Sequence, residues 1–191
     1  MEPTLWGPGL WHIMLIVSWH CSLRNLEKMK NVVMVLIPYL LPCELCKEHF
    51  VKNLEKVKRK HKLRFLTNMD VFQWVYLMKN EVNESNKCRS ISLDDLRIKF
   101  TIQNTPNEIL IAHTLLLVAL RASENDNEDH FVQLCKMLSV LLPLPNDSAL
   151  YAILKDFQKP IVYYAYKALK NTHIEHGYPC PSLKNIQSAV H

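Results

Sequence analysis

Apolar and polar residues follow a helical period along almost the whole chain. Apolar positions recur three and four residues apart, as they do on the buried face of an amphipathic helix. No stretch keeps the alternation of a half-buried strand, and the sequence contains neither Asn-Gly nor Asp-Gly, the strongest hairpin signals. The pattern therefore predicts an all-α fold.

The first half of the chain should form four long helices and one short one. The long helices are predicted over residues 8–19, 25–41, 43–60 and 70–86. Pro38 should bend the second, because proline lacks the amide hydrogen that a helix interior needs. A short fifth helix should follow Ser92, since Ser92-Leu93-Asp94-Asp95 has the spacing of a capping box.

The second half should also be helical. Thr105-Pro106-Asn107-Glu108 offers an N-cap, a proline at the first helical position and a glutamate at the third. We expect a buried helix over residues 109–121 and further helices over 131–142, 148–157 and 161–172. A boundary near Gln103 divides the chain into two predicted domains, residues 1–103 and 104–191, with no internal repeat visible in the sequence.

Composition narrows the classes of protein. Apolar residues make up 49% of the chain, which is enough for a real core. Only three residues are glycine and neither G-x-G-x-x-G nor G-K-[ST] occurs, which argues against Rossmann and P-loop folds. The net charge of +5 comes largely from the run at residues 56–64. We interpret that run as a charged helix end, with a nuclear signal or nucleic-acid patch as the alternative; no nucleic-acid partner is expected.

No membrane span or export signal is predicted. The apolar stretches at residues 10–19 and 32–41 are too short to cross a bilayer. We therefore expect a soluble protein in a reducing compartment, where six cysteines with one C-x-x-C favour redox or metal chemistry.

The motif Pro42-Cys43-Glu44-Leu45-Cys46 opens the third predicted helix. Cysteines three apart can close a small disulfide, and a helix N-terminus favours the reactive thiolate. The pair could be redox-active, could be half of a zinc site with His49, or could have no function. Zinc usually needs a second pair, and the remaining cysteines are scattered singly, at Cys21, Cys88, Cys135 and Cys180.

Three segments in order give a more specific signal. They are Trp6-Gly7-Pro8-Gly9-Leu10-Trp11, the C-x-x-C motif, and Asn80-Glu81-Val82-Asn83 with Lys87. Over about the first 100 residues the chain resembles the ERV/ALR family of sulfhydryl oxidases, especially the compact, baculovirus-like forms of large DNA viruses. The resemblance implies a helical bundle that binds FAD and a homodimer in the cytoplasm or nucleus of a host cell, or in the virion.

The resemblance also implies an activity and roles for residues. The enzyme would oxidise thiols of substrate proteins to disulfides and pass the electrons to molecular oxygen, giving hydrogen peroxide. Cys46 would face the flavin, and Cys43 would exchange with substrate thiols. The positions that match the family's cofactor contacts are Gly7, Trp11, Leu15, Lys79, Asn80, Val82, Asn83 and Lys87.

Two of those positions depart from the family, and the other cysteines stay open. Leu15 and Lys79 stand where members commonly have histidine, and His12 and His20 lie nearby without occupying a matching position. Cys180 is interpreted as a free thiol rather than half of a relay, Cys135 as a core residue, and Cys88 as either reduced or paired with Cys21.

The second half carries no redox motif. The resemblance suggests a degenerate copy of the oxidase bundle that covers the first half or builds a dimer. The alternative to an enzyme is a helical adaptor with a zinc site at Cys43, Cys46 and His49. A yellow protein would favour the oxidase, and a colourless, zinc-bearing one the adaptor.

Overall fold

The computed structural model describes residues 1–62, 64–102 and 105–190, and every regular element in those ranges is helical. The all-α prediction is confirmed. In the first half the elements are α1 (Pro3–His20), η1 (Leu23–Asn25), α2 (Leu26–Asn31), η2 (Val32–Leu36), α3 (Ile37–Tyr39), α4 (Glu44–Lys60), α5 (Asn68–Ser85) and α6 (Leu93–Ile102). In the second half they are α7 (Glu108–Glu124), α8 (Glu128–Leu141), α9 (Ala149–Lys155), α10 (Ile161–Glu175) and α11 (Leu183–Val190).

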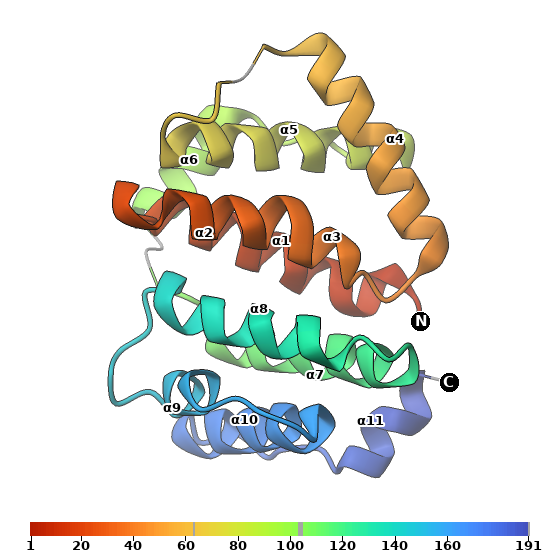
Figure 1. Ribbon diagram of the computed structural model, residues 1–191, viewed down its shortest axis with the longest axis vertical. Coiled ribbons are helices and arrows are strands. Elements are labelled where there is room, and N and C mark those ends of the chain that lie inside the picture. Colours follow the sequence, from red (N-terminus) through yellow and green to blue (C-terminus); the bar gives the residue numbers. More distant parts are fainter. Residues whose placement is uncertain (63, 103–104, 191) are drawn as a thin grey trace.

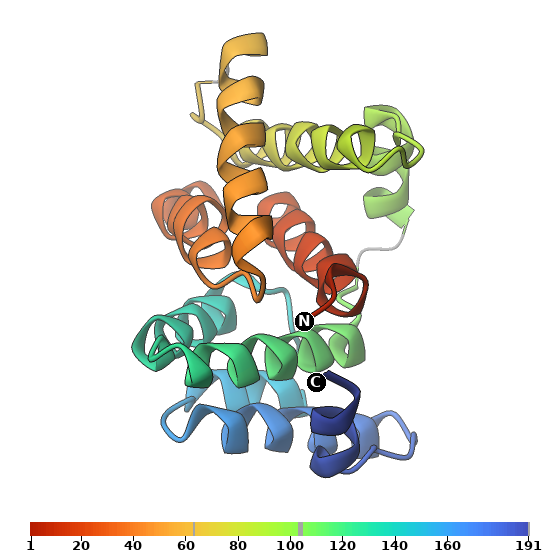
Figure 2. The same cartoon turned by 90° about the vertical axis from the view of Figure 1, so that its right-hand side faces the viewer.

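The two halves stack on each other along the long axis of the molecule. Figure 1 shows α4, α5 and α6 at one end and α9, α10 and α11 at the other. Between them lie α1 and the segment α2–α3 from the first half, packed against α7 and α8 from the second (Figures 1 and 2). None of the helices in the described ranges is long and apolar enough to span a bilayer.

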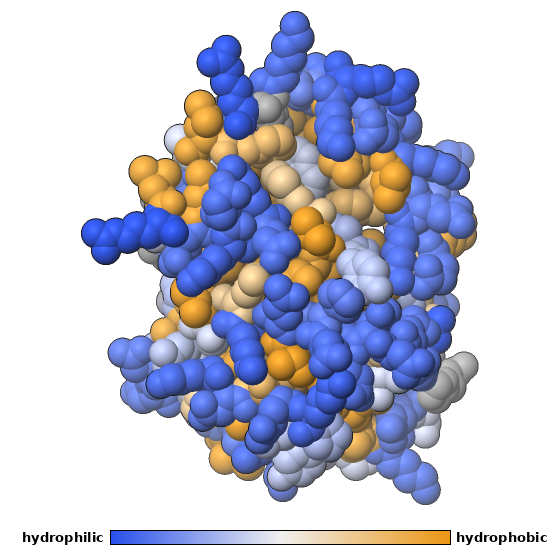
Figure 3. Space-filling view, in the orientation of Figure 1, coloured by the Kyte–Doolittle hydropathy of each residue, from blue (hydrophilic) through white to orange (hydrophobic). Residues whose placement is uncertain are grey.

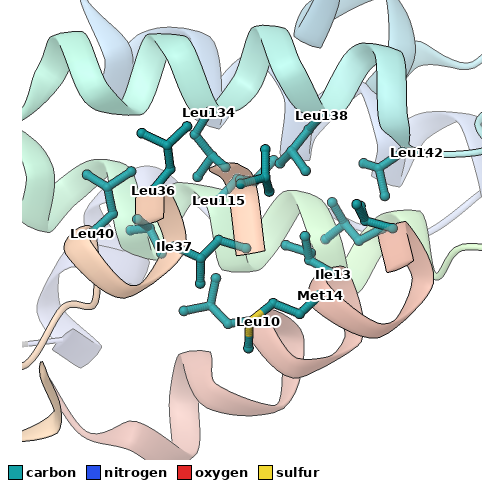
Figure 4. Packing of buried hydrophobic residues seen from close by; sticks show 14 of the residues in the cluster. Leu10, Ile13, Met14, Leu36, Ile37, Leu40, Leu115, Leu134, Leu138 and Leu142 are labelled. Carbon is teal, nitrogen blue, oxygen red and sulfur yellow. The ribbon is translucent and has the colours of Figure 1, made fainter. Parts of the chain in front are cut away.

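One hydrophobic core runs through both halves. Leu10, Ile13 and Met14 of α1 point toward the same interior as Leu115 of α7 and Leu134 of α8 (Figure 4). Burial of such side chains contributes about 1.5–3 kcal/mol each, so this core joins the two halves strongly. The core therefore crosses the domain boundary predicted near Gln103. The face shown in Figure 3 is mostly hydrophilic, with apolar side chains in separate patches.

The two halves approach each other closely at Gly9. A Cβ atom placed there would lie 1.7 Å from Oγ1 and 2.8 Å from Cβ of Thr114 on α7. Only glycine lets α1 and α7 approach this closely. Thr114 turns its hydroxyl to the carbonyl oxygen of Leu110, at 2.8 Å, so its polar atom is satisfied inside the helix.

Several predicted boundaries are wrong. Helix α1 begins at Pro3, with Pro8 inside it, because proline suits a first helical position and the buried Trp6 anchors the added turn. The second predicted helix is interrupted by a wide turn, η2, just before Pro38. Such a turn accommodates a proline ring that would otherwise meet a carbonyl of the preceding turn.

The start of α7 was also predicted wrongly, and α11 was not predicted. Asn107, not Thr105, is the N-cap of α7, and its side chain accepts a hydrogen bond from the Leu110 amide at 3.0 Å. The cap after Ser92 is confirmed, since Ser92 Oγ accepts from the Asp95 amide at 3.0 Å. Helix α11 is short, and among its described side chains Ile186 is buried in the core.

The turn after α5 and the turn after α10 share one local structure. Lys87 and Gly177 both have left-handed backbone, with φ of 56° and 72°. Just before each, a side chain holds the loop that follows. Asn83 donates to the Arg89 carbonyl at 3.3 Å, and His173 Nδ1 donates to the Pro179 carbonyl at 3.0 Å. The two turns lie 90 residues apart in the sequence, and α7 ends in a similar way, since Asp126 also has left-handed backbone with φ of 56°.

Candidate functional site

The predicted redox pair lies at the N-terminus of α4. Cys43 is the N-cap, and the Cys46 amide donates to Cys43 Sγ at 3.2 Å. The two cysteines form a disulfide with Cα atoms 5.1 Å apart. Their position at the helix N-terminus places partial positive charge beside the sulfur atoms, which stabilises a thiolate when the bond is broken. The sequence prediction of a closed pair at a helix start is confirmed.

The surroundings of the pair combine a charged contact with an exposed apolar residue. Lys47 forms an ion pair with Glu44 at 2.7 Å and lies over the ring of Tyr39 at 5.9 Å from its centroid. Leu45, between the two cysteines, is 59% exposed, while both cysteines are half-buried against the core. The disulfide is therefore anchored on one side and reachable by another protein on the other.

Helix α1 supplies the first set of candidate cofactor residues. Gly7 faces open space, because a Cβ atom there would meet nothing within 4 Å. Trp11 is half-buried, and Leu15 is 3% exposed and belongs to the core. Trp6, which was not proposed as a contact, buries its ring while Nε1 finds no hydrogen-bond acceptor among the described residues.

Helix α5 supplies the second set, and its asparagines have partners. Asn80 forms two hydrogen bonds with the backbone of Ile91, at 2.9 and 3.2 Å, and Asn83 donates to Arg89. Both asparagines therefore hold the segment that leads into α6. Val82 is half-buried, and Lys87 is exposed at the left-handed position that ends α5.

A group of basic side chains lies along α1, α5 and α6. Burial, then the charges of Lys99 and Lys79, lower the pKa of His12. Burial, then the charge of Lys99, lower the pKa of Lys79. Neither lysine forms an ion pair within the described ranges. His12 and Lys99 were not proposed from the sequence. No spacing rule links these two residues.

These features fit the chemical needs of FAD. The half-buried tryptophan Trp11 and the open space at Gly7 suit a flat ring system, and Trp6 Nε1 is a buried donor without an acceptor in the described part of the chain. The ammonium groups of Lys79 and Lys99 suit a diphosphate, which gains charge-assisted hydrogen bonds from such donors. The residues of this face would therefore hold FAD if the family's arrangement applies.

The other predicted sites have different outcomes. Cys135 is fully buried, as expected of a core residue, and burial raises its pKa well above the usual value. Cys21, Cys88 and Cys180 are free thiols, so Cys21 and Cys88 are not paired in this structure. Cys43 and Cys46 are joined to each other, and their sulfur atoms are not available to zinc in that state. Within the described ranges, the side chains close enough to share a metal ion are Glu108, Glu175 and His176, which were not proposed as ligands.

Part of the basic run has a structural role. Lys56 and Lys60 both pair with Glu81 on α5, at 3.1 and 3.0 Å, and Glu81 is buried. The hydrogen bond and charge of Lys60, with those of Lys56, lower the pKa of Glu81 despite its burial. These lysines fix α4 across α5 and so help to place the disulfide.

Comparison with known proteins shows the family to which the chain belongs. The sequence model of the Erv1 / Alr family matches residues 6–101, half of the 191-residue chain. The match includes the disulfide and every candidate cofactor residue from Gly7 to Lys87, as well as His12 and Lys99. No match was found among curated proteins or among solved structures. The family match and the disulfide at the start of a helix agree, and the chain belongs to the Erv1/Alr family.

Proposed function

We propose that this protein is a FAD-linked sulfhydryl oxidase that forms disulfides in substrate proteins. The observation that carries the proposal is the Cys43–Cys46 disulfide at the N-terminus of α4. Membership of the Erv1/Alr family, which is known for FAD-linked sulfhydryl oxidases, supports it.

The chain's own residues suit thiol–disulfide exchange. A substrate thiolate attacks Cys43 Sγ, the Cys43–Cys46 bond breaks, and Cys46 leaves as a thiolate. A second substrate thiolate attacks the mixed disulfide, which releases the substrate disulfide and leaves Cys43 reduced. The N-terminus of α4 stabilises the thiolates, and the exposed Leu45 gives an apolar contact for the substrate. The substrate loses two electrons, and the cysteine pair gains them.

Bound FAD would take the two electrons from the cysteine pair and deliver them to oxygen, giving hydrogen peroxide. By resemblance to the family, Cys46 is proposed as the cysteine on the flavin side and Cys43 as the one that meets the substrate. On α1 and α5, Trp11 and Lys79 would hold the ring system and the diphosphate. A homodimer and the compartments of a virus-infected cell remain part of the proposal by resemblance alone.

The first test is the colour and activity of the purified protein. We expect flavin absorbance near about 450 nm and oxygen consumption with dithiothreitol. Cys46→Ala should keep the flavin and lose the oxygen consumption. Cys43→Ser should also be inactive but leave Cys46 as a thiolate beside the oxidised ring, giving a long-wavelength absorbance band. A colourless protein that carries zinc would overturn the proposal, and the band in Cys46→Ala instead would reverse the two roles.

A further inference from the structure

One hydrogen bond connects the second half of the chain to the α1 face that is proposed to hold FAD. The backbone amide of Asn107 donates to Nε2 of His12 at 3.1 Å, across 95 residues of sequence. Asn107 is also the N-cap of α7. The residue that begins the first helix of the second half therefore holds a side chain of the first half.

This bond fixes the tautomer of His12. Because Nε2 accepts, the ring proton must lie on Nδ1, which then acts as a donor. Burial and the nearby charges of Lys99 and Lys79 lower the pKa of His12, so the ring stays neutral at neutral pH and keeps this tautomer. Within the described part of the chain, nothing accepts a hydrogen bond from Nδ1.

The two lysines beside His12 lack a counter-ion. Lys79 is half-buried, and the positive charge of Lys99 acts on it. No carboxylate pairs with Lys79 or Lys99 in the ranges that the structure describes. A half-buried ammonium group without an anion is unfavourable, because it loses hydration without gaining a partner. The half-buried Lys79, with the exposed Lys99 and the neutral donor of His12 near it, matches an anion with several oxygens.

Contacts away from His12 hold α1, α5 and α6 together. Asn68 at the start of α5 donates to the carbonyl of Trp19 at the end of α1, at 3.1 Å. Phe100 of α6 packs on Trp19 and Phe72, with ring centroids 6.0 and 5.6 Å apart. Lys99 precedes Phe100, so the same packing that closes this end of the bundle also places Lys99. The basic group is thus part of the packed structure.

We propose that the second half of the chain keeps the cofactor site in shape, because the Asn107 amide fixes His12 as a donor beside Lys79 and Lys99, and these three side chains receive the diphosphate of FAD. This inference rests on the proposed oxidase function. Asn107 is then a positioning residue, because it acts on the cofactor only through His12.

The test compares two flavins that differ in the diphosphate. Apo-protein of the full chain is titrated with FAD and with riboflavin, which has the same ring system without phosphate, and quenching of flavin fluorescence is measured. We expect Lys79→Ala and Lys99→Ala each to weaken FAD binding about tenfold, the factor that roughly 1.4 kcal/mol represents. Riboflavin affinity should not change. Equal losses for both flavins, or no loss for FAD, would overturn the assignment of the lysines.

A matched pair of variants tests the bond from Asn107. Asn107→Pro removes the amide hydrogen, and its φ of −80° is one that proline adopts. Asn107→Ala keeps the amide and loses the same side-chain cap. We expect Asn107→Pro to bind FAD at least threefold more weakly than Asn107→Ala, with equal riboflavin affinity. Equal FAD affinity in the two variants would overturn the positioning role.

A third variant tests the inference even if Asn107→Pro does not fold. His12→Ala leaves the backbone of α7 untouched and should weaken FAD but not riboflavin, with an unchanged thermal melt of the apo-protein. Unchanged FAD affinity in His12→Ala would contradict the inference even if Asn107→Pro fails to fold. If the unmodified protein binds neither flavin, the oxidase function and this inference both fail. If it binds FAD and these variants bind equally well, the inference alone fails.

Discussion

The N-termini of α4 and α9 share a capping geometry but differ in chemistry, because Cys43 and Cys46 of α4 correspond to Ser148 and Tyr151 of α9. Cys43 caps α4 by accepting from the Cys46 amide, and Ser148 caps α9 by accepting from the Tyr151 amide, both at 3.2 Å. Each helix precedes the long helix, α5 or α10, that ends in the same left-handed turn. Ser148 donates onward to Glu108 at 2.6 Å, whereas Cys43 bonds to Cys46. The second half therefore keeps the capping geometry without the redox pair.

The comparison separates what the fold needs from what the proposed activity needs. A cap, a left-handed turn and a side chain that holds the following loop occur in both halves. The disulfide, the half-buried lysine at position 79 and the long α4 belong to the first half. Features shared by both halves should therefore affect stability when changed, and features of the first half alone should affect flavin binding or turnover.

The largest expected effect comes from making the first cap like the second. Cys43→Ser should preserve the start of α4, because serine is a good N-cap, and should lower oxidase turnover on the order of 10³-fold or more, as loss of a catalytic nucleophile does. Ser148→Ala should lose about 1 kcal/mol of stability with turnover retained. Oxygen consumption and thermal melting of both variants measure turnover and stability separately. Near-normal turnover in Cys43→Ser would contradict the proposed role of Cys43.

The next effect concerns the contact that joins the two halves. Gly9→Ala places a methyl group 1.7 Å from Thr114 Oγ1, and such overpacking costs about 1–3 kcal/mol or more. Gly7→Ala on the same helix meets no atom and should add up to about 1 kcal/mol of helix stability. Denaturant unfolding of the apo-proteins measures both.

A second substitution makes the Gly9 result specific. Thr114→Ala removes the atom nearest the new methyl group, so it should recover part of the stability lost in Gly9→Ala. Flavin titration of Gly7→Ala adds a further check, because a ring system seated against Gly7 would bind more weakly there. Equal stability of Gly9→Ala and Gly7→Ala would mean that α1 and α7 do not approach as described.

Acid should loosen the first half before the second. Lys60 and Lys56 lower the pKa of Glu81 in the folded protein. The charged Glu81 therefore stabilises the fold above the ordinary glutamate pKa, and this stabilisation is lost as pH falls through the folded value. At the matching position α10 has Asn171, which does not titrate. Glu81→Gln should cost about 1.5 kcal/mol at neutral pH, the low end for hydrogen bonds to charged groups.

The measurement is a series of thermal melts from neutral pH to about pH 3, below the usual glutamate pKa of about 4.3. The unmodified protein should lose its advantage over Glu81→Gln as pH falls. Hydrogen exchange should show α4 opening earlier than α9. A constant difference between the two proteins across this range would show that Glu81 is not charged when folded.

The smallest effect is expected at the left-handed turns that follow α5 and α10. Lys87 has φ of 56° and Gly177 has φ of 72°, and a residue with a Cβ atom loses about 1–2 kcal/mol in this conformation. Lys87→Gly should stabilise the apo-protein by about 1 kcal/mol or less, since glycine also gains freedom when unfolded, and Gly177→Ala should destabilise it by a similar amount. Denaturant unfolding should show that the two substitutions change the free energy of unfolding in opposite directions. A change in the same direction would mean that the two turns do not have the same backbone requirement.

Much of the fold could be predicted because the helical period is strong over long segments. The period places α5 and α10 well, but it does not fix the ends of α1, where Pro8 resembles a start and lies inside the helix. Helix α11 is only eight residues long and offers little periodic signal. The turn that follows both α5 and α10 was not predicted, because different side chains, Asn83 and His173, hold the loop after each helix.

The candidate site was predictable where chemistry depends on local spacing. Cys43 and Cys46 are three apart, and so are Asn80 and Asn83, which do share one face of α5. The partners of the asparagines could not be read in the same way, because they are backbone atoms of Ile91 and Arg89. The bond from Asn107 to His12 joins residues too distant in sequence for any spacing rule.

The shared core has a consequence for the order in which the chain acquires its structure. Helix α1 is synthesised before α7, and the hydrogen bond that joins them connects residues 95 apart. At a translation rate of roughly 5–20 residues per second, α1 would wait about 5–20 seconds for that partner. During this interval the apolar residues of α1 that finally meet α7 and α8 are uncovered. Nascent chains of this protein should therefore depend on chaperones until α8 has emerged from the ribosome.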